Sequence, residues 1–223
     1  MERSKMTEEP GKETQKHKFV MVIDLARCKN ARKCVEKCQE AHHLPPFQEL
    51  MKVYLIQETE ESVPYWMPKP CFHCDRPLCV DACPVGATIK RPDGIVMIDK
   101  ERCIGCKTCM TACPFSSRQF NRAYPTSTLI EQTNLPESKM PEAKGMVSKC
   151  DFCADMVAEG KVPHCVTACP MGVIYFGDRL VDRVTNSHET VSFAELIASH
   201  PEYFHLNDPG SKPSVFYLPP LNS

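Results

Sequence analysis

The sequence has few aromatic residues, no long apolar run and no leader-like segment near its start. Aromatic residues make up 8% of the chain and include a single tryptophan, Trp66, so a large aromatic core is not expected. The longest apolar run, Phe19 to Ile23, is the size of one strand and far shorter than the roughly 20 residues that span a bilayer. The residues after Met1 contain neither an apolar signal segment nor a twin-arginine pair. We therefore expect no signal peptide and no transmembrane segment in this chain.

The charge of the chain also excludes some functions. The formal net charge is -1, so the overall balance does not point to a nucleic-acid partner. No phosphate-binding loop and no pairing of a nucleophile with a base stands out, and we expect the chain to catalyse no reaction by itself. Cysteine is the residue type in excess, with 15 among 223 residues.

Three kinds of chemistry use many cysteines: disulfides, zinc sites and iron–sulfur clusters. Disulfide-rich chains are usually short and secreted, and an odd number of cysteines leaves one thiol unpaired. Zinc sites use C-x2-C pairs but have no use for a proline after the last ligand. The spacing of the cysteines therefore decides between zinc and clusters. They form four groups: Cys28, Cys34 and Cys38; Cys71, Cys74, Cys79 and Cys83; Cys103, Cys106, Cys109 and Cys113; and Cys150, Cys153, Cys165 and Cys169.

Group three reads C-x2-C-x2-C-x3-C-P, from Cys103 to Pro114. In this bacterial ferredoxin pattern three cysteines hold one cubane cluster and the fourth binds the neighbouring cluster. Two-residue gaps allow a tight loop to wrap the cluster and to point amide N–H groups at its sulfur atoms. Groups two and four have the same design with a longer second gap, and both end in C-P. Iron–sulfur clusters are therefore the preferred interpretation.

An internal repeat relates the groups. An apolar run followed by D-x-x-R-C precedes both Cys28 and Cys103, and C-P-x-G follows both group two and group four. Asp93-Gly94, between Thr88–Lys90 and Ile95–Ile98, predicts a hairpin that joins groups two and three. Groups one and four would then form a second unit, with the run 173–176 pairing with 19–23.

The predicted fold is α+β, with two nested ferredoxin-like modules, irregular insertions and a C-terminal arm. We expect a flexible segment at 1–17 and an inserted module at 46–145 that includes an irregular stretch, Tyr124 to Gly145. The split module would comprise 18–45 and 146–180. The arm, 181–223, contains one helical pattern, Phe193 to Ser199, with Ser192 as its N-cap.

Group one lacks one ligand, because Ala31 occupies the position of its second cysteine. Four cubanes need about sixteen thiolates under the crossover rule, and the chain has 15 cysteines, one short. We expect a [3Fe-4S] cluster where the ligand is missing and [4Fe-4S] clusters at the other three sites; a [4Fe-4S] cluster with another ligand, or no cluster, are the alternatives at the deficient site. The rule predicts four ligand sets: site A, with Cys28, Cys34 and Cys169; site B, with Cys38, Cys150, Cys153 and Cys165; site C, with Cys71, Cys74, Cys79 and Cys113; and site D, with Cys83, Cys103, Cys106 and Cys109.

The four groups in this order resemble the four-cluster iron–sulfur subunits of molybdopterin-type respiratory oxidoreductases. These include polysulfide, dimethyl sulfoxide and tetrathionate reductases, with relatives in alternative complex III and the quinone reductase complex of sulfate reducers. The resemblance covers Phe19 to Phe176, and the tail Gly210 to Pro219 is similar to the ending of such subunits. It implies electron transfer between a molybdopterin-type large subunit, at the site A end, and a membrane subunit that handles quinone, at the site D end.

Other partners and locations follow less directly. A multihaem cytochrome is a further candidate partner, and the resemblance implies a place peripheral to the bacterial cytoplasmic membrane, on either side. A soluble polyferredoxin, or an iron–sulfur subunit of a hydrogenase or formate dehydrogenase, are the alternative functions. His73, between Cys71 and Cys74, is interpreted as a partly exposed loop residue. Arg27 and Arg102 either offset cluster charge or pair with a nearby carboxylate.

Overall fold

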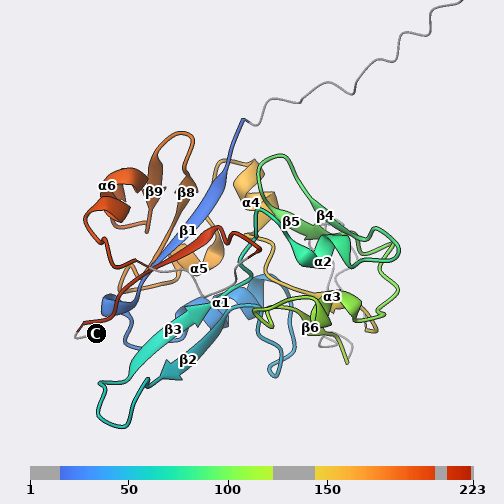
Figure 1. Ribbon diagram of the computed structural model, residues 1–223, viewed down its shortest axis with the longest axis horizontal. Coiled ribbons are helices and arrows are strands. Elements are labelled where there is room, and N and C mark those ends of the chain that lie inside the picture. The colour runs from blue at the N-terminus through green and yellow to red at the C-terminus, as the bar shows by residue number, and fades with distance from the viewer. Residues whose placement is uncertain (1–15, 123–143, 204–209, 222–223) are drawn as a thin grey trace, which may run out of the picture.

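The structure, a computed structural model, describes residues 16–122, 144–203 and 210–221. Most of the segment predicted to be flexible, 1–17, and of the predicted insertion, 124–145, lies outside these residues. Figure 1 shows short helices and small sheets joined by long loops, in agreement with the predicted α+β class.

The largest sheet joins the two ends of the described chain (Figure 1). Its strand order is β10–β9–β8–β1–β11. β1 is antiparallel to β8, with Met21 opposite Phe176, which confirms the predicted pairing of 19–23 with 173–176. On its other side β1 runs parallel to β11, with Ile23 opposite Tyr217. The bounds of these strands are β1 Phe19–Asp24, β8 Ile174–Asp178, β9 Arg183–Thr185, β10 Thr190–Val191 and β11 Val215–Leu218.

The segment predicted as an arm, 181–223, is partly built into this sheet. It supplies β9, β10, β11 and the helix α6 (Phe193–Ala198). The side chain of Ser192 accepts a hydrogen bond from the Glu195 amide at 3.0 Å, which confirms the predicted N-cap. The four residues of β11 are all buried, as expected for a strand that is covered on both faces. A role of the tail in docking remains a prediction.

The strand β1 separates two hydrophobic cores. Met21 and Ile23 belong to the main core, which also contains most of the buried cysteines. Val20 and Val22 belong to a smaller core, against which Phe193 and other residues of α6 pack. Because successive side chains of a strand point to opposite faces, α6 covers one face of the sheet and the cysteine-rich loops lie under the other. The sheet is thus the platform that holds one end of the cysteine-rich region.

Three further strand pairs lie in the middle of the chain. β4 (Thr88–Lys90) pairs with β5 (Val96–Ile98), as the Asp-Gly turn predicted. β2 (Lys52–Ile56) and β3 (Tyr65–Lys69) form a longer hairpin for which the sequence analysis made no prediction. β6 (Gln119–Phe120) pairs with β7 (Val147–Ser148) across the predicted insertion. That last pair fixes the two ends of the insertion next to each other.

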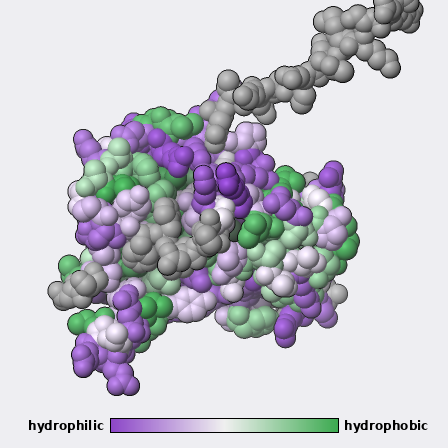
Figure 2. All heavy atoms as spheres, in the orientation of Figure 1, coloured by the Kyte–Doolittle hydropathy of each residue, from purple (hydrophilic) through white to green (hydrophobic). Residues whose placement is uncertain are grey.

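The helices near the cysteines are short. The longest is α1 (Lys33–Ala41), and it follows a single 3-10 turn, η1 (Leu25–Arg27). The others are α2 (Leu78–Asp81), α3 (Thr108–Thr111), α4 (Ala154–Ala158) and α5 (His164–Thr167). In the described part of the chain, no helix is both long and apolar enough for a membrane crossing. Hydrophilic and hydrophobic side chains are interspersed on the face drawn in Figure 2.

Candidate metal centres

The four cysteine loops share one backbone feature, which supports the predicted repeat. In each loop the residue before the second ligand position adopts a left-handed conformation. The φ values are 57° at Asn30, 41° at His73, 65° at Gly105 and 58° at Phe152. Non-glycine residues adopt such angles rarely, so their occurrence at three of the four matched positions indicates one loop geometry used four times. Group one retains this geometry although Ala31 replaces its cysteine.

Short helices carry the third cysteine of groups two, three and four. Cys79, Cys109 and Cys165 lie on α2, α3 and α5. Each of these helices ends two residues before the fourth cysteine of its group, so the fourth thiol is free to turn towards a different set of thiols. In group one both Cys34 and Cys38 lie on α1, whose contact with α5 brings groups one and four together.

Site A is a thiol-lined cavity with one side occupied by alanine. Cys28, Cys34 and Cys169 line one small pocket together with Ala31. Burial raises the pKa of the Cys34 thiol to about 12, and the charges of Cys169 and Cys28 contribute to the shift. The structure therefore brings the three predicted thiols together and places Ala31 beside them.

Site D is a pocket of nearly the same size, lined by four thiols. These thiols belong to Cys83, Cys103, Cys106 and Cys109. This is the most open of the four sets: Cys106 is exposed, and hydrogen bonds from Thr108 lower its pKa. All four predicted thiols of site D face one cavity.

Site B is the most deeply buried set. Burial raises the pKa of Cys38 and of Cys165 well above the usual value, and the charge of Cys150 contributes to both shifts. Burial also raises the pKa of Cys150, to about 12. His42 Nε2 lies 3.7 Å from Cys153 Sγ, so this histidine belongs to the surroundings of site B.

Site C combines group two with one cysteine of group three. Burial raises the pKa of the Cys74 thiol to about 12, although a hydrogen bond from Ser211 opposes the shift. The charges of Cys71, Cys79 and Cys113 also act on Cys74, which places all four predicted thiols near one another. Ser211 precedes β11, so the C-terminal segment reaches this site.

Electrostatic interactions between the sets favour the order A, B, C, D. The charge of Cys34 in site A affects Cys165 in site B, and that of Cys71 in site C affects Cys150 in site B. The charge of Arg118 acts on both Cys79 in site C and Cys109 in site D. The two end positions of the row are therefore site A, next to Ala31, and site D, at the exposed Cys106.

Amide groups donate to cysteine sulfur at two equivalent positions. The Ala87 amide donates to Cys83 Sγ at 3.2 Å, and the Val173 amide donates to Cys169 Sγ at 3.4 Å. In both cases the donor follows the C-P-x-G turn, whose glycine has a left-handed conformation. Such N–H groups stabilise negative charge on a ligating sulfur.

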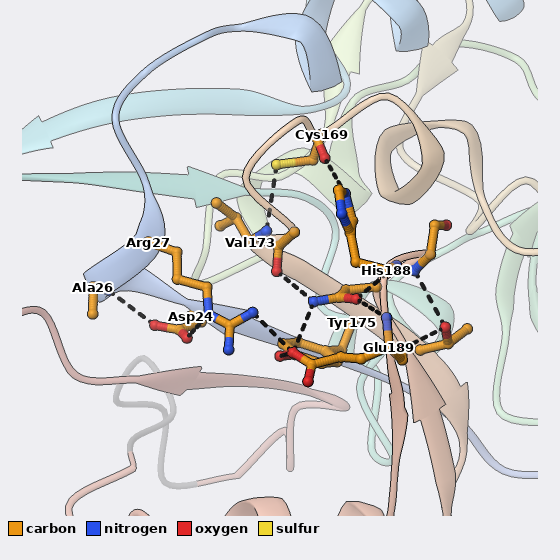
Figure 3. Close-up of polar contacts among 12 residues, drawn as sticks. Asp24, Ala26, Arg27, Cys169, Val173, Tyr175, His188 and Glu189 are labelled. Carbon is orange, nitrogen blue, oxygen red and sulfur yellow. Dashed lines mark hydrogen bonds and ion pairs between the residues drawn. The ribbon is translucent and has the colours of Figure 1, made fainter.

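A polar network holds the loop of Cys169 against the sheet (Figure 3). Arg27 and the Tyr175 hydroxyl both donate to Glu189 Oε1, at 2.9 and 2.6 Å. The ring of His188 lies 3.4 Å from the Cys169 carbonyl oxygen. Arg27 also pairs with Asp24 at 2.9 Å, and Arg102 pairs with Asp99 at 3.2 Å in the equivalent loop. The carboxylate-pairing interpretation of both arginines is thus confirmed.

Three polar residues lie in the interior although their burial was not predicted. His73 is only 1% exposed, so its interpretation as a partly exposed loop residue was wrong. The Nδ1 atom of His73 accepts a hydrogen bond from the Val96 amide at 3.0 Å, and the ring of His73 stacks on that of Phe152 in the loop of group four. Arg118 and Lys149 are each 4% exposed. Arg118 and Lys149 lie close to cysteine motifs in the sequence, but this is only a weak indication of burial, because arginine and lysine are usually exposed.

Comparison with known proteins identifies the family. The model of a 4Fe-4S dicluster domain matches residues 62–128 and 124–179. The chain therefore belongs to this iron–sulfur family. It is similar to a subunit of the selenate reductase of Mesobacillus selenatarsenatis, at 35% identity over 90% of this chain and 71% of the relative.

Two further relatives extend the comparison. A subunit of the anaerobic dimethyl sulfoxide reductase of Escherichia coli is 32% identical over 90% of this chain and 88% of the relative. The Hdr-like menaquinol oxidoreductase iron–sulfur subunit 1 of Archaeoglobus fulgidus is 32% identical over 79% of this chain and 76% of the relative. These similarities confirm the resemblance to iron–sulfur subunits of such reductases, and iron–sulfur electron transfer is the activity of the family.

Proposed function

We propose that this chain carries electrons along a row of four clusters, at sites A, B, C and D. The observation that carries the proposal is the convergence of thiols from distant segments into four sets. Each set combines cysteines of two groups, as the crossover rule requires. A bound cluster accepts and releases one electron at a time.

The residues around the sites fit such clusters. Thiols line the cavities of sites A and D, and at Cys83 and Cys169 a backbone amide already donates to the sulfur. Buried thiols with raised pKa values resist ionisation in a metal-free protein, and a bound iron would stabilise their thiolate form. The donors are all sulfur, which suits clusters.

Site A is proposed to hold [3Fe-4S], while the other three sites hold [4Fe-4S]. The pocket at site A is about as large as the pocket at site D. An alanine at the position of the second cysteine thus removes a ligand without closing the space. Three thiolates suffice for a three-iron cluster, and Ala31 offers no atom that could bind a fourth iron.

The chain is proposed to connect two partner subunits. Site A would face a molybdopterin-type large subunit and site D a membrane subunit that reacts with quinone, with a multihaem cytochrome as a further candidate. The relatives named as reductase and menaquinol oxidoreductase subunits support this arrangement. At the site D end, Ile104 is 65% exposed and Val85 40% exposed, which leaves apolar surface beside the cluster loop.

The nested arrangement of modules is part of the same proposal. The split module, 18–45 with 146–180, is supported by the pairing of β1 with β8 and by the contact of α1 with α5. The inserted module is supported by the β4–β5 hairpin. We place the assembled complex at the periphery of the bacterial cytoplasmic membrane.

The test is anaerobic purification of the chain with its partners. We expect about 15 iron atoms per chain, from three four-iron clusters and one three-iron cluster. Electron paramagnetic resonance of the oxidised protein should show a three-iron signal. A colourless, iron-free protein would exclude the function; a stable, iron-loaded monomer without partners would instead favour a soluble shuttle.

A further inference from the structure

Arg118 is a buried cation between two cluster sites. Its side chain is 4% exposed and borders the cavity of site D. Its charge acts on Cys79 of site C and on Cys109 of site D. Nη1 also donates to the Thr88 hydroxyl at 3.2 Å, which anchors the guanidinium at the start of β4.

In the described part of the chain, this guanidinium has no carboxylate that balances its charge, since Arg118 forms no ion pair there with an aspartate or glutamate. Burying an uncompensated charge is strongly unfavourable. Burial lowers the pKa of Arg118, but the nearby Cys79 and Cys109 charges outweigh it and raise the pKa. Among the described residues, the groups that can balance Arg118 as anions are therefore the thiols of sites C and D.

In the described part of the chain, buried cations lie at only some of the junctions between sites. Arg118 and Lys149 are the only buried lysine or arginine side chains in the part of the chain that the structure describes. Lys149 lies at the next junction, where it donates to the Cys150 carbonyl at 2.9 Å. The described residues place no buried lysine or arginine at the junction of sites A and B. By contrast Arg102, next to Cys103, has a side chain that is 67% exposed and is paired with Asp99.

We propose that Arg118 is the shared counter-charge of sites C and D and raises the reduction potentials of both. The proposal rests on the proposed function, since it requires clusters at these two sites. Reduction by one electron adds one negative charge to a site. Arg118 keeps its positive charge throughout. When an electron moves from one site to the other, the first site is therefore oxidised and the second is reduced, and no proton is transferred.

The charge of Arg118 has a larger effect than that of a surface arginine, because it is screened little by water. A buried cation near the ligating sulfur atoms stabilises the reduced state of a cluster more than its oxidised state, so reduction becomes more favourable. Because Arg118 contacts both sets, its removal should affect two clusters at once. A surface cation next to a single loop does not have this property.

The test compares Arg118→Gln with the matched control Arg102→Gln in the full, iron-loaded chain. Potentials are measured by redox titration with electron paramagnetic resonance, after iron and cluster signals have been counted in the wild type. We expect Arg118→Gln to weaken reduction at sites C and D by about tenfold or more, which for one electron is about 59 mV. Arg102→Gln should change either potential much less. Equal shifts in the two variants would overturn the proposal.

A second variant covers the case in which Arg118→Gln does not bind clusters. Arg118→Lys keeps the charge, but the compact ammonium group on a flexible stem cannot extend towards both Cys79 and Cys109 as the planar guanidinium does. We expect this variant to bind its clusters and to show a lowered potential at one of the two sites. Potentials equal to those of the wild type at both sites would overturn the proposal. Wild-type protein without clusters at sites C and D would instead overturn the proposed function.

Discussion

The ring of His73 stacks on the ring of Phe152, with their centroids 3.7 Å apart and their planes 22° apart. The two residues occupy the same position in loops two and four, directly before the second cysteine, and both have positive φ. The stack thus joins the loop of site C to that of site B. It also explains why a histidine between two cysteines is fully buried.

Phe152→Ala should destabilise the protein strongly. Phe152 is 1% exposed and contacts both His73 and Phe176, so its removal leaves a cavity at the junction of sites B and C. We expect a loss of about 3–5 kcal/mol, measured as a lower thermal unfolding midpoint of the iron-loaded chain. Phe47→Ala, at a position that is 70% exposed, is the control and should change stability by less than about 0.5 kcal/mol. A similar midpoint for both variants would contradict the packing role of the stack.

Ala31→Cys should convert the cluster at site A. The new thiol would enter the cavity that Cys28, Cys34 and Cys169 already line. We expect the three-iron resonance signal of the oxidised protein to disappear and the iron content to rise by about one atom per chain. Ala198→Cys, on the exposed side of α6, adds a sixteenth cysteine away from the sites and should leave the signal unchanged. Persistence of the three-iron signal in Ala31→Cys would count against our assignment of site A.

Gly105→Ala should impair site D. A Cβ at Gly105 would lie 1.8 Å from the Gly145 carbonyl oxygen, and the residue has φ of 65°. Gly94→Ala is a matched control, because Gly94 also has positive φ but has no atom within 4 Å of the added Cβ. We expect Gly94→Ala to cost about 1–2 kcal/mol and to retain all iron, whereas Gly105→Ala should lose about four iron atoms. Full iron content in Gly105→Ala would show that the Gly105–Gly145 approach is not needed.

Asp178→Asn should produce a pH-dependent loss of stability. Burial raises the pKa of Asp178, but hydrogen bonds from the Lys18 and Leu180 amides and from His17 outweigh it, so the pKa lies below its usual 3.8. A carboxylate with a lowered pKa stabilises the folded state above its unfolded pKa, and this contribution disappears as the pH falls through its folded pKa. We expect the variant to be about 1–3 kcal/mol less stable near pH 7, from hydrogen bonds to a charged acceptor.

The measurement is the thermal midpoint of wild type and Asp178→Asn as a function of pH. The difference between them should shrink as the pH falls below 3.8. A difference that stays the same at every pH would mean that the charge of Asp178 does not contribute and that only its shape matters.

Local spacing was sufficient to predict much of the cysteine-rich region. The repeated motifs predicted the β4–β5 hairpin and the pairing of β1 with β8, and the structure has both. The crossover rule predicted four sets of thiols; those of sites A and D line one pocket each, and cluster binding at all four remains a prediction. The strand pairings could be predicted because a ferredoxin loop is a short backbone geometry that its own residues specify. For the same reason, the spacing was sufficient to identify Ala31 as the residue at the position where a cysteine ligand is missing.

Burial was harder to predict than spacing. His73 was predicted to be partly exposed, and no prediction was made for Arg118 and Lys149, yet all three lie in the interior. The sequence around a single polar residue does not reveal which groups will surround its side chain in the folded protein. Its burial becomes favourable only when distant segments supply a ring, a carbonyl or a thiolate next to it.

The sequence by itself determined the spacing of the cysteines, how the loops turn and that Ala31 stands where a cysteine is expected, because these depend on neighbours a few positions apart; the assignment of clusters to the cysteines remains a prediction. Only the tertiary structure decided that β11 lies parallel to β1, that the sites follow one another from A to D, and that Arg118 lies between two of them. These features depend on contacts between segments far apart in the chain, whose free energies arise from desolvation and charge at the point of contact.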